Sequence, residues 1–278
     1  MALDAAELKR LKQKARQIRE EIVKITYTCG GAHIGGALSQ TDLMVALYYK
    51  FMNIDPKKPE LANRDRFILS KGHGGVGHAV VLGDLGYFDK ETLKEFNKTG
   101  SPFGMHLDCL KVPGVDASTG SLGHGFSIAI GMAIGARLQG KKWRTYVMLG
   151  DGELQAGPVW ESAMAAPHFK VTNMTTIVDR NMLCIDGSTE EIMALEPLKA
   201  KWEAFGWKVI ELDGHDFNEI CDGIELANAS KDQPAVIIAK TVKGKGVDFM
   251  ECDKKWHYAG LDDVTMNKAL ESLKKGAK

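Results

Sequence analysis

The feature that most restricts the fold is an alternation of short apolar segments and helical segments from residue 66 onwards. The apolar segments are strand-like and cover residues 66–69, 145–149, 175–178, 208–212 and 235–239. Segments with helical spacing fill residues 125–138, 158–168, 198–205 and 218–229. This alternation predicts an α/β fold, in which helices connect parallel strands and cover both faces of the sheet.

The N-terminal part of the chain is helical by the same criterion. Apolar residues recur at helical spacing between residues 4 and 28, among Lys, Arg and Glu, which predicts one amphipathic helix. A second helix is expected over residues 41–51, with Ser39 or Thr41 as its cap. Because no repeat or low-complexity linker interrupts the chain, residues 1–278 are expected to form one domain with an N-terminal helical segment.

Composition excludes several classes of function. Lys plus Arg number 36 and Asp plus Glu number 36, so no net field favours nucleic acid or an anionic membrane. The apolar stretches are too short and interrupted to span a bilayer, and residues 1–20 lack the apolar part of a signal peptide. The five cysteines are widely spread, without CxxC spacing. We therefore expect a protein of the reducing cytoplasm.

Polar residues follow two of the predicted strands at the point where each strand ends. Asp151 follows the strand that ends at Leu149, and Asn181 follows the strand that ends at Val178. Ligands of open parallel sheets bind beyond the carboxyl ends of the strands. Carboxylate and amide oxygens suit Mg²⁺ or Ca²⁺, and a phosphate group would supply further oxygens. Gly152 would let the backbone approach such a phosphate closely, so we predict a metal and diphosphate site here.

Histidines lie in glycine-rich or turn-like segments at five places: His33, His73, His106, His124 and His257. Glycines on both sides of a histidine suggest backbone folded closely around a ligand. Neutral imidazole can move protons near neutral pH, which makes these residues candidates for catalysis. The other histidines look like ordinary helix or turn residues: His78, His168 and His215.

Several motifs occur in the order and spacing of transketolases. They cover residues 31–39, 70–74, 104–106, 119–123 and 150–153, and residues 240–246 with Trp256-His257 extend the match to nearly the whole chain. The chain resembles the N-terminal, diphosphate-binding part of a transketolase. More narrowly, it is similar to the separate N-terminal subunit of the split bacterial and archaeal type.

The resemblance implies a thiamine diphosphate-binding fold and a set of cofactor ligands. Asp151, Asn181 and the backbone carbonyl of Leu183 would bind the metal, Mg²⁺ or Ca²⁺. The residues that would contact or line the cofactor are His73, Gly120, Ser121, Leu122, Gly152, Glu153, Asn181 and His257. The catalytic candidates are His33, His73, His106 and His257, of which three would face the ketose hydroxyls: His33, His106 and His257.

The resemblance also implies the reaction and a partner. A two-carbon ketol unit would pass from a ketose phosphate to an aldose phosphate, with thiamine diphosphate as the electron sink. The pyrimidine-binding and C-terminal domains of a full-length transketolase have no counterpart in these 278 residues. We therefore expect the partner to be a C-terminal transketolase subunit, in an assembly with two copies of each chain.

Three positions depart from the family pattern. Ala156 stands where a glutamate of a carboxylate relay is usual, although Glu161 matches a second acid of the family. His124 replaces the usual glutamine, and Tyr258-Ala259-Gly260 replaces a more typical Gly-Lys-Ala-Pro. The last two changes lie near cofactor or substrate, so they could signal an unusual donor, a sulfo-sugar or branched-sugar phosphate, or could be neutral.

Three other functions fit parts of the sequence. Residues 72–77 satisfy the GxGxxG pattern of a nicotinamide dehydrogenase, but residues 89–96, where a second strand should end, read as helix. The α-subunit of a 2-oxo acid dehydrogenase and a deoxyxylulose phosphate synthase share Gly-Asp-Gly followed by Asn. A non-catalytic protein that kept the fold is the third alternative, and Ala156 gives it some weight.

Overall fold

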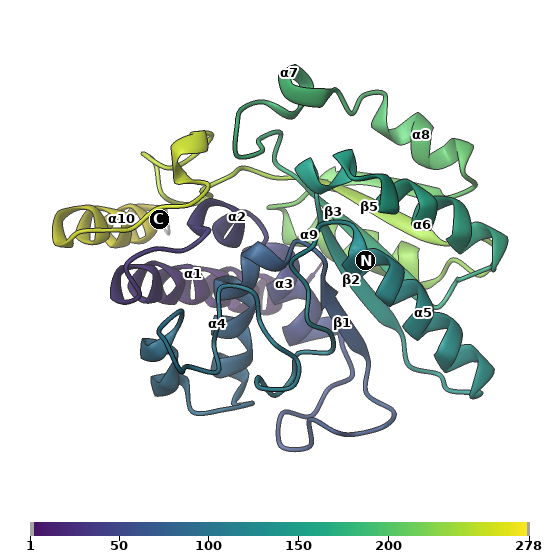
Figure 1. The fold of residues 1–278 in the computed structure, drawn as a ribbon, viewed down its shortest axis with the longest axis horizontal. Helices are drawn as coiled ribbons and strands as arrows, with labels where there is room; N and C mark the ends of the chain where they lie inside the picture. Colours follow the sequence, from purple (N-terminus) through teal and green to yellow (C-terminus); the bar gives the residue numbers. More distant parts are fainter. Residues whose placement is uncertain (1–2, 277–278) are drawn as a thin grey trace.

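A computed structural model describes residues 3–276, and its centre is a parallel five-stranded sheet (Figure 1). The strand order is β1-β2-β3-β5-β4. The strands are β1 (Arg66–Leu69), β2 (Thr145–Gly150), β3 (Met174–Arg180), β4 (Lys208–Asp213) and β5 (Ala235–Lys240). Each predicted strand is confirmed to within two residues at either end. The parallel sheet is the one that the alternation of strand-like and helical segments predicts.

The central strands are buried on both faces, because helices cover both sides of the sheet. Every residue of β2 and β3 is buried. Successive side chains of a strand point to opposite faces. In β2, Tyr146 and Met148 accordingly pack into one hydrophobic cluster, while Val147 and Leu149 pack into the other. Burial on both faces explains why the strands read as continuous apolar runs.

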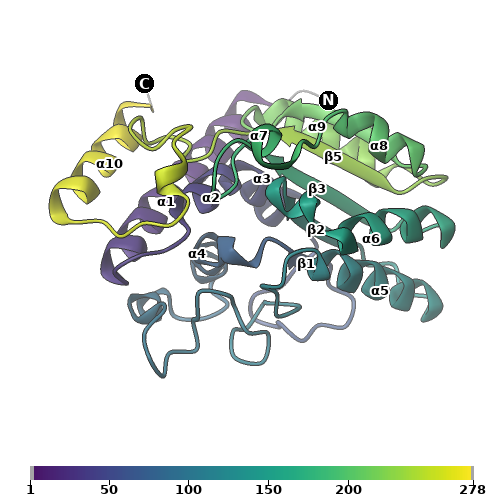
Figure 2. The same ribbon diagram turned by 45° about the horizontal axis from the view of Figure 1, so that its top comes forward.

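Two groups of helices form the outer layers (Figure 2). One face carries α5 (His124–Leu138), α6 (Gly157–His168) and α8 (Leu198–Ala204). The other carries α1 (Ala5–Thr28), α3 (Thr41–Ala46), α4 (Gly75–Leu85) and α9 (Phe217–Asn228). The N-terminal helix is confirmed: Asp4 caps it by accepting a hydrogen bond from the Glu7 N–H at 2.7 Å.

The predicted helix over residues 41–51 is present as α3 and a π-helical turn, but its start differs from the prediction. Helix α2 (Ile34–Ser39) runs almost directly into α3, and a π-helical turn follows over Leu47–Phe51. The predicted cap at Ser39 or Thr41 is wrong. The Ser39 hydroxyl donates to Asp179 at 2.6 Å and the Thr41 hydroxyl donates to the Ala37 carbonyl at 2.8 Å. Both hydroxyls therefore serve other partners.

The remaining elements are short turns and a C-terminal helix. The 3₁₀ turns cover Gly72–Gly74, Lys90–Glu95, Gly152–Gln155 and Lys254–Trp256. Helix α7 (Thr189–Met193) lies in the connection from β3 to α8. Helix α10 (Asp263–Lys275), which the sequence pattern did not predict, packs on α1. Within residues 3–276, no helix combines the length and the apolar character needed to cross a membrane.

Candidate active site

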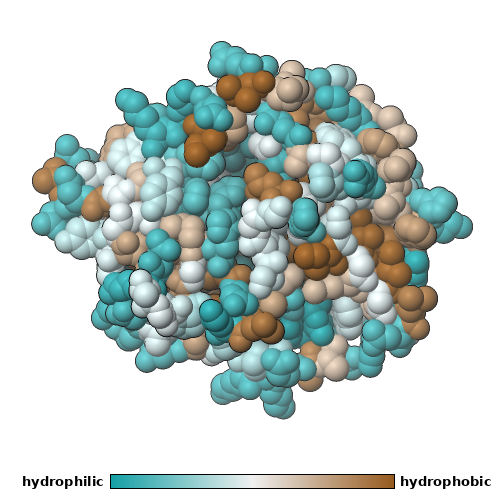
Figure 3. Space-filling model, in the orientation of Figure 1, coloured by the Kyte–Doolittle hydropathy of each residue, from teal (hydrophilic) through white to brown (hydrophobic). Residues whose placement is uncertain are grey.

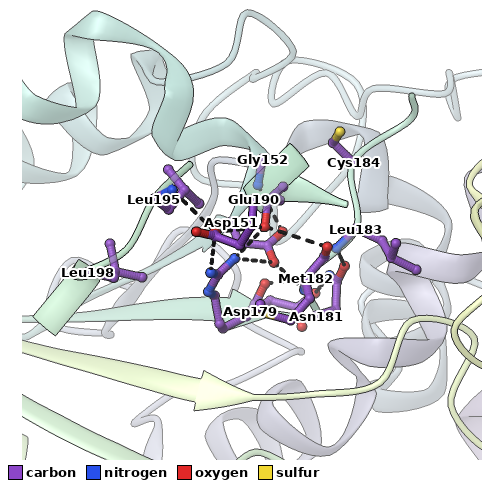
Figure 4. A network of polar contacts seen from close by, with 12 residues as sticks. Asp151, Gly152, Asp179, Asn181, Met182, Leu183, Cys184, Glu190, Leu195 and Leu198 are labelled. Carbon is purple, nitrogen blue, oxygen red and sulfur yellow. Dashed lines mark hydrogen bonds and ion pairs between the residues drawn. The ribbon is translucent and has the colours of Figure 1, made fainter. Parts of the chain in front are cut away.

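Strands β2 and β3 end at the same edge of the sheet, and the predicted metal ligands follow them there. The register pairs Gly150 with Asp179, so Asp151 and Asn181 leave neighbouring strands one and two residues later. Both side chains are buried, with 2% and 8% exposure. Figure 4 shows them in one network of polar contacts. The prediction that adjacent strands bring these two residues to one edge is confirmed.

The Asp151 carboxylate is held by backbone N–H groups of the segments that follow β2 and β3. Its two oxygens accept hydrogen bonds from the Gly152 N–H at 2.8 Å and the Met182 N–H at 2.6 Å. The Arg180 guanidinium stands 3.4 Å away. Burial raises the pKa of Asp151 above its usual value, and the nearby negative charge of Asp179 raises it further. A cation bound here would offset both effects.

Two more oxygen donors border Asp151. The amide oxygen of Asn181 accepts the Leu183 N–H at 3.2 Å, while the amide nitrogen points toward Asp179 at 3.4 Å. The carbonyl of Leu183 accepts a hydrogen bond from the Lys243 ammonium at 2.6 Å. Among residues 3–276, no group of three or more His, Cys, Asp or Glu could hold a metal ion. A metal at this edge would therefore be held by mixed carboxylate, amide and backbone oxygens, a set that suits a hard cation.

A buried ion pair supports the site from behind. Asp179 is fully buried and accepts hydrogen bonds from the Lys71 ammonium and the Ser39 hydroxyl, both at 2.6 Å, and from the Thr241 hydroxyl. Burial opposes ionisation, but the charge and hydrogen bond of Lys71 outweigh it and lower the pKa of Asp179. Because every partner comes from a different segment, this pair fixes the ends of β1, β3 and β5 relative to α2. Sequence reasoning missed it.

The four predicted catalytic histidines form one cluster. His33 lies at its centre, with ring centroids 5.2 Å from His73, 5.3 Å from His257 and 6.4 Å from His106. The rings of His73 and His257 stack with their centroids 5.4 Å apart. These residues are 224 positions apart at the extremes, from 33 to 257, and only the fold unites them. The clustering is what a shared role at one site requires.

Burial keeps three of these histidines neutral: His33, His73 and His257. Burial, aided by His106, lowers the pKa of His33 to about 4. Burial and the charge of Lys71 lower the pKa of His73 to about 2, and burial and the charge of Lys243 lower the pKa of His257 to about 3. The Nδ1 atom of His33 is buried and has no hydrogen-bond partner among the described residues. Such an atom is costly unless a ligand satisfies it.

The predicted cofactor-lining segment lies against the histidines. Gly120 has φ +156°, and a Cβ there would come within 3.1 Å of the His106 ring. A Cβ on Gly72 would come within 2.7 Å of the Thr119 hydroxyl, which itself donates to the Leu69 carbonyl at 2.7 Å. The two loops therefore pack closely at glycines, and Gly120 packs directly against the His106 ring. On the same segment, Ser121 and Leu122 are exposed.

Glu153 holds this segment in place. Its carboxylate accepts the Ser70 hydroxyl at 2.5 Å, the Gly123 N–H at 2.8 Å and the Gly150 N–H at 3.0 Å. It is 2% exposed, and burial raises its pKa. With three protein donors on its two oxygens, Glu153 positions the predicted cofactor-lining segment and the end of β2. These three hydrogen bonds explain the burial of Glu153 without a direct contact between Glu153 and a cofactor.

Lys243 is a further site residue that sequence reasoning did not single out. It is 2% exposed, and its ammonium lies between the Leu183 carbonyl and Nδ1 of His257, at 2.6 and 3.0 Å. Burial and repulsion from Lys71 lower its pKa to about 8. The available signal was a lysine placed just after a buried strand and directly before Gly244. Lys243 thus links the oxygen donors to the histidine cluster.

The three departures from the family pattern lie at different distances from the histidine cluster. Ala156 precedes α6 and gives that helix no side-chain cap, and Glu161 is exposed on α6. His124 is exposed at the start of α5. Tyr258 lies directly against His33, with ring centroids 5.1 Å apart. Of these residues, only Tyr258 contacts the histidine cluster.

Comparisons with known proteins agree on one family. Residues 11–275 match the family described as "Transketolase, thiamine diphosphate binding domain". Over 248 residues the chain is 39% identical to a subunit of the apulose-4-phosphate transketolase from Phocaeicola vulgatus, covering 89% of this chain and 88% of that protein. Over 265 residues it is also 39% identical to a 6-deoxy-6-sulfo-D-fructose transketolase subunit from a Clostridium species, covering 95% and 96%.

Solved structures give the same fold. A transketolase from Campylobacter jejuni superposes with a TM-score of 0.88 at 31% identity, over 98% of this chain and 43% of that one. A transketolase variant from Pichia stipitis superposes with a TM-score of 0.89 at 29% identity, over 96% and 40%. The chain thus spans about two fifths of the solved transketolases that it matches. These relatives favour a transketolase over a 2-oxo acid dehydrogenase subunit or a nicotinamide dehydrogenase.

Proposed function

The chain belongs to the family of transketolase thiamine diphosphate-binding domains, and we propose on this basis that it is the N-terminal subunit of a two-chain transketolase. The enzyme would move a two-carbon ketol unit from a ketose phosphate to an aldose phosphate. One observation carries the proposal: buried oxygen donors at two strand ends and a cluster of four histidines meet in one site, joined by Lys243. Neither part alone would suffice for this reaction.

The strand-end oxygens fit a divalent metal. The Asp151 carboxylate, the Asn181 amide oxygen and the Leu183 carbonyl would bind Mg²⁺, with Ca²⁺ as an alternative. Mg²⁺ prefers six oxygens and usually takes several from phosphate and water. Lys243 now occupies the Leu183 carbonyl. Two cations repel at one carbonyl, so a bound metal would turn this ammonium toward a diphosphate oxygen.

The diphosphate would lie between the metal and the histidines. Gly152, whose N–H donates to Asp151 at 2.8 Å, would contact the diphosphate through its backbone. His73, His257 and Lys243 would donate hydrogen bonds to it. Gly120 and the exposed residues Ser121 and Leu122 would line the rest of the cofactor. When bound, thiamine diphosphate supplies the electron sink that lets a carbon–carbon bond of the ketose break.

His33, His106 and His257 would face the sugar and move its protons. Each half of the reaction moves protons on and off hydroxyl oxygens, a task that positioned imidazoles perform. The low pKa values of His33 and His257 in the free chain leave both residues neutral at pH 7. A neutral imidazole carries one N–H donor and one acceptor nitrogen, so it can serve a hydroxyl in either direction.

A partner chain would complete the site. The loop after β3 exposes apolar side chains next to the strand-end oxygens: Met182 (39%), Ile185 (60%), Ile192 (47%) and Met193 (63%). Figure 3 shows hydrophobic side chains over α7, at the top of the molecule. We assign this surface to a C-terminal subunit with the pyrimidine-binding and C-terminal domains, in an assembly with two copies of each chain. The five free cysteines suit our assignment to the cytoplasm.

The donor sugar is a second part of the proposal. Pentose phosphates are the default donors of a pentose phosphate transketolase. The names of two relatives instead specify apulose 4-phosphate and 6-deoxy-6-sulfo-D-fructose as substrates of those proteins. Since both relatives match nearly the whole chain at 39% identity, branched and sulfonated ketoses belong in the same test.

Reconstitution tests the proposal directly. The chain would be co-expressed with a C-terminal transketolase subunit encoded beside it, and the complex supplied with thiamine diphosphate and Mg²⁺. Xylulose 5-phosphate, apulose 4-phosphate and 6-deoxy-6-sulfofructose would each be offered with aldose phosphates. We expect transfer from at least one donor, and only with both chains present. Metal-dependent cofactor binding without transfer from any ketose would reject the proposed reaction.

A further inference from the structure

The segment after His257 is joined to the segment that carries His33. Ala32 and Ala259 exchange two backbone hydrogen bonds, both of 3.1 Å, as an isolated antiparallel bridge. Next to such a hydrogen-bonded pair, the adjacent residues of the two segments face each other on the opposite side. These residues are His33 and Tyr258. The backbone itself therefore sets Tyr258 beside the central histidine of the cluster.

The ring of Tyr258 is held from two directions. It meets the His33 ring edge-on, with centroids 5.1 Å apart and an interplanar angle of 73°. It also lies over Gly31, where a Cβ would be 3.1 Å from the tyrosine hydroxyl and 3.3 Å from Cζ. The absence of a side chain at Gly31 is what leaves room for the ring. A ring fixed in this way would border any ligand that contacts His33.

The hydroxyl of Tyr258 remains free to bind. The residue is 48% exposed, and nothing within residues 3–276 forms a hydrogen bond with this hydroxyl. A phenol can both donate and accept a hydrogen bond. On the adjacent His33 ring, the buried Nδ1 atom also has no partner among the described residues. An aromatic body with a free polar end, next to an unsatisfied imidazole, fits a ligand that carries hydroxyl groups.

We propose that Tyr258 is a specificity-determining residue for the ketose donor. Its ring forms the wall of the sugar site beside His33, and its hydroxyl hydrogen-bonds a hydroxyl group of the donor. This inference rests on the proposed function, because it requires a ketose to face the histidines. It adds a selecting contact from a residue that takes no part in proton transfer or in metal binding.

Two substitutions, made in the complex with the C-terminal subunit, distinguish the contribution of the Tyr258 hydroxyl from that of its ring. Tyr258→Phe removes only the hydroxyl, and Tyr258→Ala removes the ring as well. Tyr49→Phe is the matched control, since its hydroxyl donates to Asp84 on α4 and no site residue contacts it. Each complex is assayed with the three donors named above. Donor binding is also measured by calorimetry on complexes prepared without cofactor, which reports sugar contacts independently of turnover.

We expect Tyr258→Phe to raise KM for the preferred donor by about 3- to 10-fold, the effect of one lost neutral hydrogen bond, with kcat nearly unchanged. Calorimetry should show the same loss of donor affinity. Tyr258→Ala should change the ratio of kcat/KM values between donors by about tenfold or more. Cofactor affinity should stay at the wild-type value in both variants, as it should in Tyr49→Phe.

The inference is overturned if both Tyr258 variants keep wild-type KM values and donor preference while the wild-type complex is active. If Tyr258→Ala does not assemble, Tyr258→Phe alone decides the matter through KM and calorimetry. Failure of the proposed function looks different, because the wild-type complex itself would then transfer no ketol unit from any donor. Equal losses of cofactor affinity and donor affinity in Tyr258→Phe would also count against a selecting role.

Discussion

The strand-end oxygens and the histidine cluster are built in opposite ways. Asp151 and Asn181 are nearly fully buried, and each accepts hydrogen bonds from backbone N–H groups of the protein itself. Their positions follow from the register of β2 and β3. His33 and His106 lie in loops, His106 is exposed, and His33 keeps an unpartnered nitrogen within the described chain. The first region has its hydrogen-bond partners within the described chain, and the second leaves one buried nitrogen, Nδ1 of His33, without one.

This difference assigns the two regions to different steps. A preorganised set of donors loses little freedom when a ligand arrives, which favours tight binding of the cofactor. A buried nitrogen without a partner, such as Nδ1 of His33, is satisfied only when a sugar is present, which favours the reacting complex over the free protein. Substitutions in the first region should thus change affinity for the cofactor, and substitutions in the second should change turnover.

The largest effect is expected from Asp151→Ala. Removing a charged metal ligand should cost several kcal/mol and abolish retention of thiamine diphosphate by the complex. Calorimetric titration with cofactor and Mg²⁺ measures it. Asp186→Ala, an exposed aspartate on the same loop, is the control and should bind normally. Normal cofactor affinity and activity in Asp151→Ala would reject the metal assignment.

The next largest effect concerns turnover. His33→Ala should lower kcat by about 100-fold or more, the usual contribution of a positioned proton-transfer group, and leave cofactor affinity nearly unchanged. Steady-state kinetics and cofactor titration on one preparation give both numbers. His168→Ala, at the end of α6 and away from the cluster, should change neither. A loss of cofactor affinity as large as the loss of kcat would reject the proposal that the two regions serve different steps.

Lys243 joins the two regions, so its replacement should affect both moderately. Lys243→Met should weaken cofactor binding by about 10- to 100-fold, because a charge-assisted hydrogen bond contributes about 1.5–3 kcal/mol. It should also lower kcat through the loss of its contact with His257. Lys245→Met removes a partly exposed lysine near Glu251 and should alter neither quantity. An effect confined to kcat would place Lys243 with the histidines alone.

The last effect concerns stability rather than function: stability should depend on pH. The pKa of His33 is about 4 in the folded chain and about 6.5 when unfolded. The unfolded state therefore binds more protons, and the free energy of unfolding falls as the pH drops from about 6.5 toward 4. In His33→Asn this part of the loss should vanish, so the wild type and the variant should diverge below about pH 6.5 in denaturant titrations. Parallel curves would show that His33 is not held neutral by its surroundings.

Most of the sheet could be predicted, because each strand is marked by its own short stretch of sequence. A buried parallel strand reads as an apolar run, and β2 and β3 each end in polar residues or glycine that mark the sheet edge. From this, the meeting of Asp151 and Asn181 followed. Helix α10 was missed although Asp262 caps it, and α2 was missed because six residues with two glycines give no helical signal.

The supporting contacts could not be predicted, because they join distant segments. Lys71 and Asp179 are 108 residues apart, and the sequence around neither residue indicates that they form an ion pair. Lys243 reaches His257 and Leu183 only because β5 lies next to β3 in the sheet order. The histidine motifs indicated that each loop binds something. That His33 lies at the centre of the cluster is a property of the fold.

The most direct test of the account locates the metal. Crystals of the reconstituted complex would be grown with thiamine diphosphate and Mn²⁺ in place of Mg²⁺, and anomalous scattering would locate the manganese. We predict one peak about 2.1 Å from oxygens of Asp151, Asn181 and Leu183, with Lys243 turned from Leu183 toward the diphosphate. A bound cofactor whose metal lies elsewhere, with Lys243 still on the Leu183 carbonyl, would contradict the account.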